Sequence, residues 1–371
     1  SSSSSSSSPK YEWVTVDNNE ELEDEKNLYW DKQIDVAIER ANEAGGTKGG
    51  HQKGGLNCAQ GESESSKTKD IFRVYTAGKG PLNIFCLHGA GHSAMSWAVL
   101  ASHMKSKEYK ILSYDMRGHG RTRAVDDSLM SVEQLVKDTV NVMESTIDSK
   151  EPTIIAGHSL GGSLAVKVAK AMKKIRIVGL VIVDVVEGTA IASLPSMANV
   201  VRSRPSSFPS NKDAVNWALK NLWLRNEESA SLSIPSQLKK QVRRRLVKEK
   251  GDGQKQHQQL QQQSPLACCR YVWRTDLLLS EKYWKNWFKG MTELVVSLKI
   301  PKVLILAGRD RMAKDKKLTV AQMQGKFQMV FVSKSGHSIQ EDRPEKVAEV
   351  IHAFASRILK MDGFNTLTGQ I

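Results

Sequence analysis

The sequence predicts an α/β fold, in which a mostly parallel central sheet is covered by helices on both faces and interrupted by an inserted helical cap. Three observations predict it. From residue 69 onward, short apolar strands alternate with amphipathic helices, which is typical of a parallel sheet buried on both faces. One of these strands ends in a Gly-x-Ser-x-Gly motif at residues 157–161. The alternation then stops between residues 196 and 289 and resumes afterwards, which indicates an insertion.

The composition is that of a folded chain with a large core. Its 371 residues are 40% hydrophobic, which suits one large domain with insertions or two smaller domains. No apolar run reaches the ~18 residues of a membrane span, so we predict no membrane partner. Much of the formal charge of +14 lies between residues 236 and 255, where a basic run is typical of a solvated loop. We therefore predict no nucleic-acid partner.

Cysteine usage indicates a reducing compartment. The four cysteines are Cys58, Cys86, Cys268 and Cys269, and the adjacent pair has poor geometry for a disulfide. The sequence also lacks the features of a signal peptide. We expect a cytoplasmic or nuclear protein, or one found in both compartments.

Composition divides the chain into four parts. Residues 1–68 begin with eight serines and continue with a Gly, Ser, Lys and Gln stretch, so we expect a poorly ordered N-terminal region. The first part of the core follows at 69–195. The cap occupies 196–289, and its middle, about 238–269, is basic and then glutamine-rich, so we expect a disordered loop there. The second part of the core is 290–371.

The elements of the core follow from their hydrophobic patterns. Ser131 and Gln134 have the spacing of a capping box, which predicts the start of a helix with an apolar face. A closing helix carries apolar residues from Val347 to Ile358. We expect strands in the apolar run before Ser159 and at residues 71–75, 82–87, 109–114, 177–183, 302–307 and 327–332.

Ser159 lies at the turn between a strand and an Ala-rich helix. Such a turn is so sharp that its central residue takes a strained backbone angle, and the residues two positions away, Gly157 and Gly161, must lack side chains. The strain exposes the serine hydroxyl beside the helix N-terminus, where backbone N–H groups stabilise negative charge. The alternative is an ordinary strand-to-helix turn. The apolar strand and the helix favour the nucleophile of an α/β-hydrolase fold.

A serine nucleophile needs a histidine base and an acid that orients the histidine. In this fold the chain order is Ser, acid, His, and His337 follows a late strand and precedes the final helix, so we predict that it is the base. Asp184 and Asp310 each follow an apolar strand and would lie at the carboxyl edge of the sheet. The residues alone favour neither acid.

The oxyanion hole should consist of backbone N–H groups. Leu160 follows the nucleophile, and Ala90 or Gly91 lies in the small-residue turn after the strand at 82–87. No His, Cys, Asp or Glu cluster has metal-ligand spacing, and no phosphate loop or dinucleotide motif occurs, so we predict no metal and no cofactor. We expect structural hydrogen bonds from three more histidines, His88, His119 and His158.

The Gly-x-Ser-x-Gly turn is shared by many hydrolases, whereas the stretches Asp184–Ala190 and Gln322–Met329 are much more specific. With these stretches, and between Phe72 and about Phe354, the chain closely resembles the protein phosphatase methylesterases. These enzymes remove the methyl ester from the C-terminal leucine of the protein phosphatase 2A catalytic subunit. The basic, glutamine-rich cap loop departs from the acidic loop that is usual in the family.

The resemblance implies Ser159 as nucleophile, His337 as base and Asp184, rather than Asp310, as acid. It also implies the catalytic subunit of protein phosphatase 2A as partner, with its C-terminal tail as substrate and Met323 as a candidate contact. Two alternatives remain open. One is a small-molecule carboxylesterase with the same triad, and the other is a phosphatase-binding scaffold or inhibitor that does not depend on catalysis.

Overall fold

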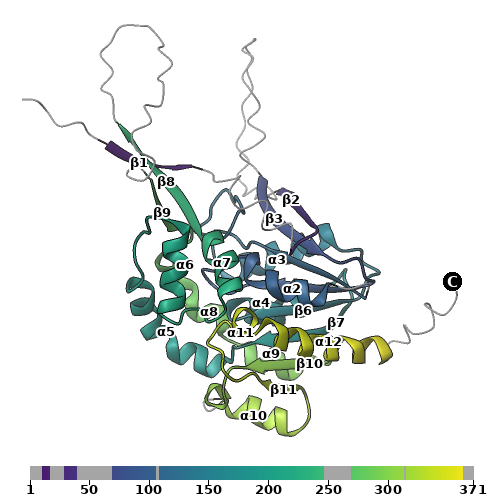
Figure 1. The fold of residues 1–371 in the computed structure, drawn as a ribbon. Helices are drawn as coiled ribbons and strands as arrows, with labels where there is room; N and C mark the ends of the chain where they lie inside the picture. Colours follow the sequence, from purple (N-terminus) through teal and green to yellow (C-terminus); the bar gives the residue numbers. More distant parts are fainter. Residues whose placement is uncertain are drawn as a thin grey trace, which may run out of the picture.

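An eight-stranded sheet forms the centre of the molecule (Figure 1). The computed structural model describes residues 11–16, 29–39, 69–105, 108–245, 269–312 and 315–361. The strand order is β11-β10-β7-β6-β4-β5-β3-β2. The bounds are β2 Lys32–Glu39, β3 Lys69–Ala77, β4 Leu82–Leu87, β5 Tyr109–Tyr114, β6 Thr153–His158, β7 Ile177–Val183, β10 Lys302–Leu306 and β11 Gln328–Phe331.

All neighbouring strands from β11 to β5 are parallel, and only β3 and β2 run antiparallel to their neighbours. The carboxyl ends of β4, β6, β7 and β10 therefore meet at one edge of the sheet. The loops that follow these four strands are brought together there, although they are far apart in sequence. This arrangement positions the candidate site.

Helices cover both faces of the sheet (Figure 1). Successive side chains of a strand point to opposite faces, so Ile155 packs in the core on one side and Ile154 in the core on the other. The Ile155 side is covered by α3 (Val132–Thr146), α4 (Leu160–Ala171) and α9 (Met291–Ser297). The Ile154 side is covered by η2 (Ala94–Trp97), α2 (Ala98–Met104), α11 (Ile339–Asp342) and α12 (Pro344–Met361). None of the helices in the described residues is long and apolar enough to cross a membrane.

The expectation that residues 1–68 are poorly ordered was wrong for two segments. β2 forms the edge of the central sheet by pairing with β3 over its whole length. The preceding Trp30 is only 1% exposed and its ring packs on Tyr75, with the ring centroids 5.8 Å apart. The second segment is β1 (Tyr11–Val16), which pairs with a strand of the cap. The rest of this region lies outside the described residues.

The cap contains helices and a small sheet (Figure 1). Its helices are α5 (Glu187–Arg202), α6 (Asn211–Lys220), α7 (Glu227–Ser236), η3 (Leu277–Tyr283) and α8 (Trp284–Phe288). The sheet is antiparallel with the order β1-β8-β9, where β8 is Leu238–Arg245 and β9 is Cys269–Trp273. The cap is therefore not purely helical, and the predicted disordered loop was wrong at 238–245. Residues 246–268 lie outside the described residues.

Candidate active site

Ser159 lies between β6 and α4 with φ 52° and ψ −118°, in the region that favours glycine. Two glycines make this turn possible. A Cβ on Gly157 would lie 2.1 Å from the carbonyl oxygen of Gly161, and a Cβ on Gly161 would lie 2.2 Å from the carbonyl oxygen of Leu87. Neither position can hold a side chain without moving the backbone. The turn thus has the geometry of a nucleophile elbow.

Asp184 and His337 form the polar pair beside the serine. The Nδ1–H of His337 donates to Asp184 Oδ2 at 2.8 Å, and Oδ1 accepts the N–H of Ala307 at 3.0 Å. Asp184 is 3% exposed, whereas the His337 side chain is 49% exposed. Because the proton on Nδ1 points at the carboxylate, Nε2 is the nitrogen with a lone pair available to accept a proton.

Two contacts hold the loop of His337. His158 donates from Nε2 to the carbonyl oxygen of His337 at 2.9 Å, and burial lowers the pKa of His158 well below its usual range. The N–H of Gly336 donates to Asp342 Oδ2 at 2.6 Å. Asp342 Oδ1 also accepts the N–H of Arg225 from the cap at 2.7 Å. The cap and the histidine loop are therefore joined through one buried carboxylate.

Ser159, Asp184 and His337 line one cleft with a volume of about 90 Å³. Its other walls come mainly from the start of α5 and from Phe288 at the end of α8, and they are largely apolar. Among the hydrogen bonds of these described residues, none joins Ser159 Oγ to His337 Nε2. Catalytic hydrogen bonds are often long in a free enzyme and shorten when substrate is bound.

The three predicted oxyanion donors differ in their surroundings. The N–H groups of Leu160, at the first position of α4, and of Ala90 have no acceptor within the described residues. The N–H of Gly91 instead donates to the buried Nε2 of His119 at 2.9 Å. The prediction that Gly91 offers an oxyanion donor is therefore wrong, because this N–H is already bonded. Leu160 and Ala90 are the remaining pair.

Asp310 and Met323 are not among the residues that line this cleft. Asp310 is exposed in η4 (Arg309–Met312), and the acid hydrogen-bonded to His337 is Asp184. Met323 ends α10 (Lys316–Met323) with 79% of its surface exposed.

The predicted structural roles of three histidines are confirmed. His88 accepts the N–H of Met116 at 3.0 Å, His119 accepts the N–H of Gly91, and His158 contacts the His337 loop. Sequence reasoning missed the buried pair of His92 and Glu341, whose Nδ1 and Oε1 atoms lie 3.1 Å apart. These two residues are 249 positions apart, so no local pattern could have indicated the contact.

Comparison with known proteins agrees with this geometry. A model of the alpha/beta hydrolase family matches residues 84–350, so the chain is an α/β hydrolase. Among solved structures, E-2-(acetamidomethylene)succinate hydrolase matches with a TM-score of 0.58 at 15% identity. The match covers 77% of this chain and 96% of the hydrolase chain. A marine microorganism esterase has a TM-score of 0.54 at 19% identity over 77% of this chain and 98% of its own. At these identities the likeness shows the fold.

Relatives with similar sequences show which family of α/β hydrolases the chain belongs to. Protein phosphatase methylesterase 1 of Mus musculus is 40% identical over 80% of this chain and 81% of the relative. The enzyme of that name from Schizosaccharomyces pombe is 36% identical over 73% of each chain. The chain belongs to the protein phosphatase methylesterase family.

Proposed function

We propose that the chain is a serine carboxylesterase that demethylates the C-terminal leucine methyl ester of the protein phosphatase 2A catalytic subunit. The observation that carries this proposal is the hydrogen bond from His337 Nδ1 to buried Asp184, in a cleft that Ser159 also lines. This arrangement holds the His337 ring by Nδ1 against the carboxylate, and the ring lines the same cleft as Ser159. The relatives supply the substrate class, because their names specify a protein phosphatase.

The reaction proceeds in two acyl-transfer steps. Ser159 Oγ attacks the ester carbonyl carbon as its proton passes to His337 Nε2, while Asp184 stabilises the resulting imidazolium. The N–H groups of Leu160 and Ala90 donate to the oxyanion. The bond to the methoxy oxygen then breaks, and His337 returns the proton so that methanol leaves. Water attacks the acyl-enzyme with His337 as base and releases the carboxylate, so no cofactor is needed.

The walls of the cleft suit a leucine side chain. Six of the residues that line it have apolar side chains, and an isobutyl group is favoured against them because it leaves water without losing hydrogen bonds. The apolar lining residues are Val185, Val186, Ala190, Leu194, Met197 and Phe288. A tail that ends in leucine therefore fits the site better than one that ends in a charged residue.

Met323 is a proposed contact with the body of the phosphatase. It is exposed, and Val320, three positions earlier on the same helix face, is 51% exposed. Adjacent exposed apolar side chains favour a protein contact. We expect Met323→Ser to raise the KM for methylated phosphatase and to leave the KM for a short nitrophenyl ester unchanged. Equal effects on both substrates would argue against a docking role.

The direct test is incubation of the purified protein with the methylated catalytic subunit, with the mass of the tail peptide as readout. We expect the tail to lose the mass of one methylene group with wild-type protein and to keep it with Ser159→Ala. A parallel assay with nitrophenyl esters separates the small-molecule esterase. Fast turnover of those esters with an intact phosphatase tail would overturn the proposed substrate.

The scaffold alternative needs a separate measurement. A Ser159→Ala protein should still bind the phosphatase, because the substitution removes only one hydroxyl from the cleft. If that variant reproduced every cellular effect of the wild-type chain, catalysis would not be the function. We expect instead that it fails to lower the methylated fraction of the phosphatase in cells.

A further inference from the structure

We propose that His119 is a positioning residue that aims the Ala90 N–H into the oxyanion hole by holding the neighbouring Gly91. The inference rests on the proposed esterase function and adds a residue outside the triad. His119 does not touch the cleft, since it is 1% exposed and is absent from the residues that line it. It acts on the site through the backbone of Gly91, to which it is hydrogen-bonded.

Both ring nitrogens of His119 are used. Nδ1 lies 2.8 Å from the carbonyl oxygen of Arg117, which can only accept, so Nδ1 carries the proton. Nε2 lies 2.9 Å from the N–H of Gly91, which can only donate, so Nε2 must be unprotonated. Burial lowers the pKa of His119 to about 4, which keeps the ring neutral near pH 7. The surroundings thus fix one tautomer.

A second histidine makes the reverse contact. His88, in the turn that carries Ala90, accepts the N–H of Met116 at Nε2, 3.0 Å away. Each of the two turns therefore contributes a ring that accepts a backbone N–H from the other turn. The two rings also pack together, with centroids 5.0 Å apart. The oxyanion turn after β4 is fixed to the turn after β5 at two points.

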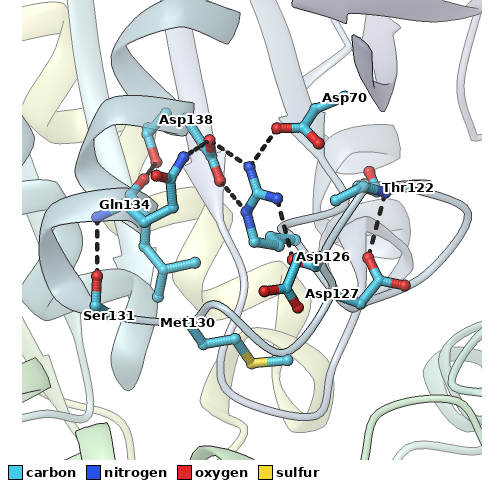
Figure 2. A network of polar contacts seen from close by, with 12 residues as sticks. Asp70, Thr122, Asp126, Asp127, Met130, Ser131, Gln134 and Asp138 are labelled. Carbon is cyan, nitrogen blue, oxygen red and sulfur yellow. Dashed lines mark hydrogen bonds and ion pairs between the residues drawn. The ribbon is translucent and has the colours of Figure 1, made fainter. Parts of the chain in front are cut away.

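The second turn is itself anchored by a buried ion cluster (Figure 2). Arg117 is fully buried and donates from Nε and Nη2 to Asp138 at 2.8 and 2.9 Å, and from Nη2 to Asp70 at 2.7 Å. Its Nη1 donates to the carbonyl oxygen of Asp126 at 3.2 Å. Figure 2 shows Asp70 and Asp138 reaching the guanidinium from separate elements. This fixes the residue whose carbonyl oxygen sets the tautomer of His119.

The geometry of Gly91 explains why the contact matters for chemistry. Gly91 has φ +77°, a conformation that residues with a side chain rarely adopt, and a Cβ there would lie 3.0 Å from the side chain of Leu277. If Nε2 were lost, the Gly91 N–H would have no partner and the turn could rotate to find one. The Ala90 N–H would then leave the position where the oxyanion develops.

The test uses two substitutions that separate the ring nitrogens. In His119→Gln the amide oxygen reaches the position of Nε2 and can accept from Gly91, whereas the side chain of His119→Asn is too short and keeps only the contact with Arg117. Removal of an oxyanion donor lowers kcat by about 10²–10³, so displacement in His119→Asn should lower kcat about 10- to 100-fold with KM nearly unchanged. His119→Gln should retain most of the wild-type kcat.

Nitrophenyl ester turnover is the readout, with folded sites counted by labelling of Ser159 with a fluorophosphonate. Equal kcat per labelled site in the two variants would overturn the proposal. The result does not depend on the phosphatase substrate, because the phosphatase takes no part in nitrophenyl ester turnover. Failure of wild-type protein to demethylate phosphatase would instead overturn the proposed function.

A measurement on the unsubstituted protein covers the case in which His119→Asn does not fold. Nitrogen NMR distinguishes the two neutral tautomers of a histidine ring. We expect His119 to be protonated at Nδ1 and unprotonated at Nε2 near pH 7. The opposite tautomer could not accept from Gly91, and its detection would refute the proposal.

Discussion

Three fully buried neutral histidines should make the protein unusually sensitive to mild acid. Burial lowers the pKa of His88, His119 and His158 below the ordinary value, to about 4 for His119. The unfolded chain binds a proton at each of these rings as pH falls through about 6.5, whereas the folded chain does not. Stability is therefore complete above pH 6.5 and decreases as pH falls toward the folded-state pKa. Between pH 7.0 and 5.5 each ring should lower the free energy of unfolding by about 1.3 kcal/mol, which makes about 4 kcal/mol for the three rings.

Urea unfolding at pH 7.0, 6.25 and 5.5 measures this directly. Burial also raises the pKa of the Asp127 and Asp138 carboxyls above the ordinary value, and their contribution to the pH dependence has the opposite sign to that of the histidines. The matched control is His119→Gln, whose free energy of unfolding should fall by about 1.3 kcal/mol less over the same window. A total fall below about 1 kcal/mol in the wild type, or an identical fall in the variant, would refute the reasoning.

Further substitutions test the site and the core. Asp184→Asn should lower kcat by a factor on the order of 10³–10⁴, whereas Asp310→Asn should leave kcat within about twofold, because the imidazole donates to Asp184 and Asp310 does not line the cleft. Gly161→Ala should abolish fluorophosphonate labelling of Ser159, because its Cβ would lie 2.2 Å from a backbone oxygen, and retained labelling would contradict the elbow geometry. Trp30→Ala should lower the free energy of unfolding by about 3–5 kcal/mol in urea titrations, and a loss under 1 kcal/mol would show that the N-terminal segment is not part of the core.

The central strands could be predicted to the residue because they are buried on both faces. The predicted ranges 82–87, 109–114 and 177–183 agree with β4, β5 and β7. A strand covered by helices on both sides is mostly apolar, so the apolar run between turn residues marks its extent. The Gly-x-Ser-x-Gly turn was similarly evident, because steric demands restrict its residue types.

The two strands of the N-terminal region, β1 and β2, lacked such a signal. β2 places Ile34, Val36 and Ile38 at alternate positions among polar or small residues, and it lies in a stretch of otherwise polar composition. An edge strand exposes one side, so its composition resembles that of a loop. β1 was still harder to identify, because its partner β8 lies more than two hundred positions away and within a basic run that resembled a solvated loop. Pairing between such distant segments leaves no local pattern.

The choice of acid shows where local sequence stops being informative. Asp184 follows β7 and Asp310 follows β10, and these strands are neighbours in the sheet. Both positions therefore satisfy the same topological rule. The structure distinguishes them by local backbone geometry, because Asp184 has φ 49° at the very end of β7 and accepts the N–H of Ala307, whereas Asp310 lies farther along in an exposed turn. The position of Asp184 thus depends on a contact with Ala307, which follows the neighbouring strand β10 and cannot be inferred from the residues around Asp184.

The turn that contains Ala90 and Gly91 also depends on a contact that local sequence does not show. A run of small residues correctly indicated the turn that contains Ala90 and Gly91, yet the sequence did not show that the Gly91 N–H is bonded to His119, 28 positions away. His119 in turn depends on the carbonyl oxygen of Arg117, whose side chain is fixed by Asp70 and Asp138. The residues that react can thus be read from short motifs, whereas their alignment comes from buried polar contacts between turns. Substitutions in those contacts should therefore change kcat in a protein whose triad is intact.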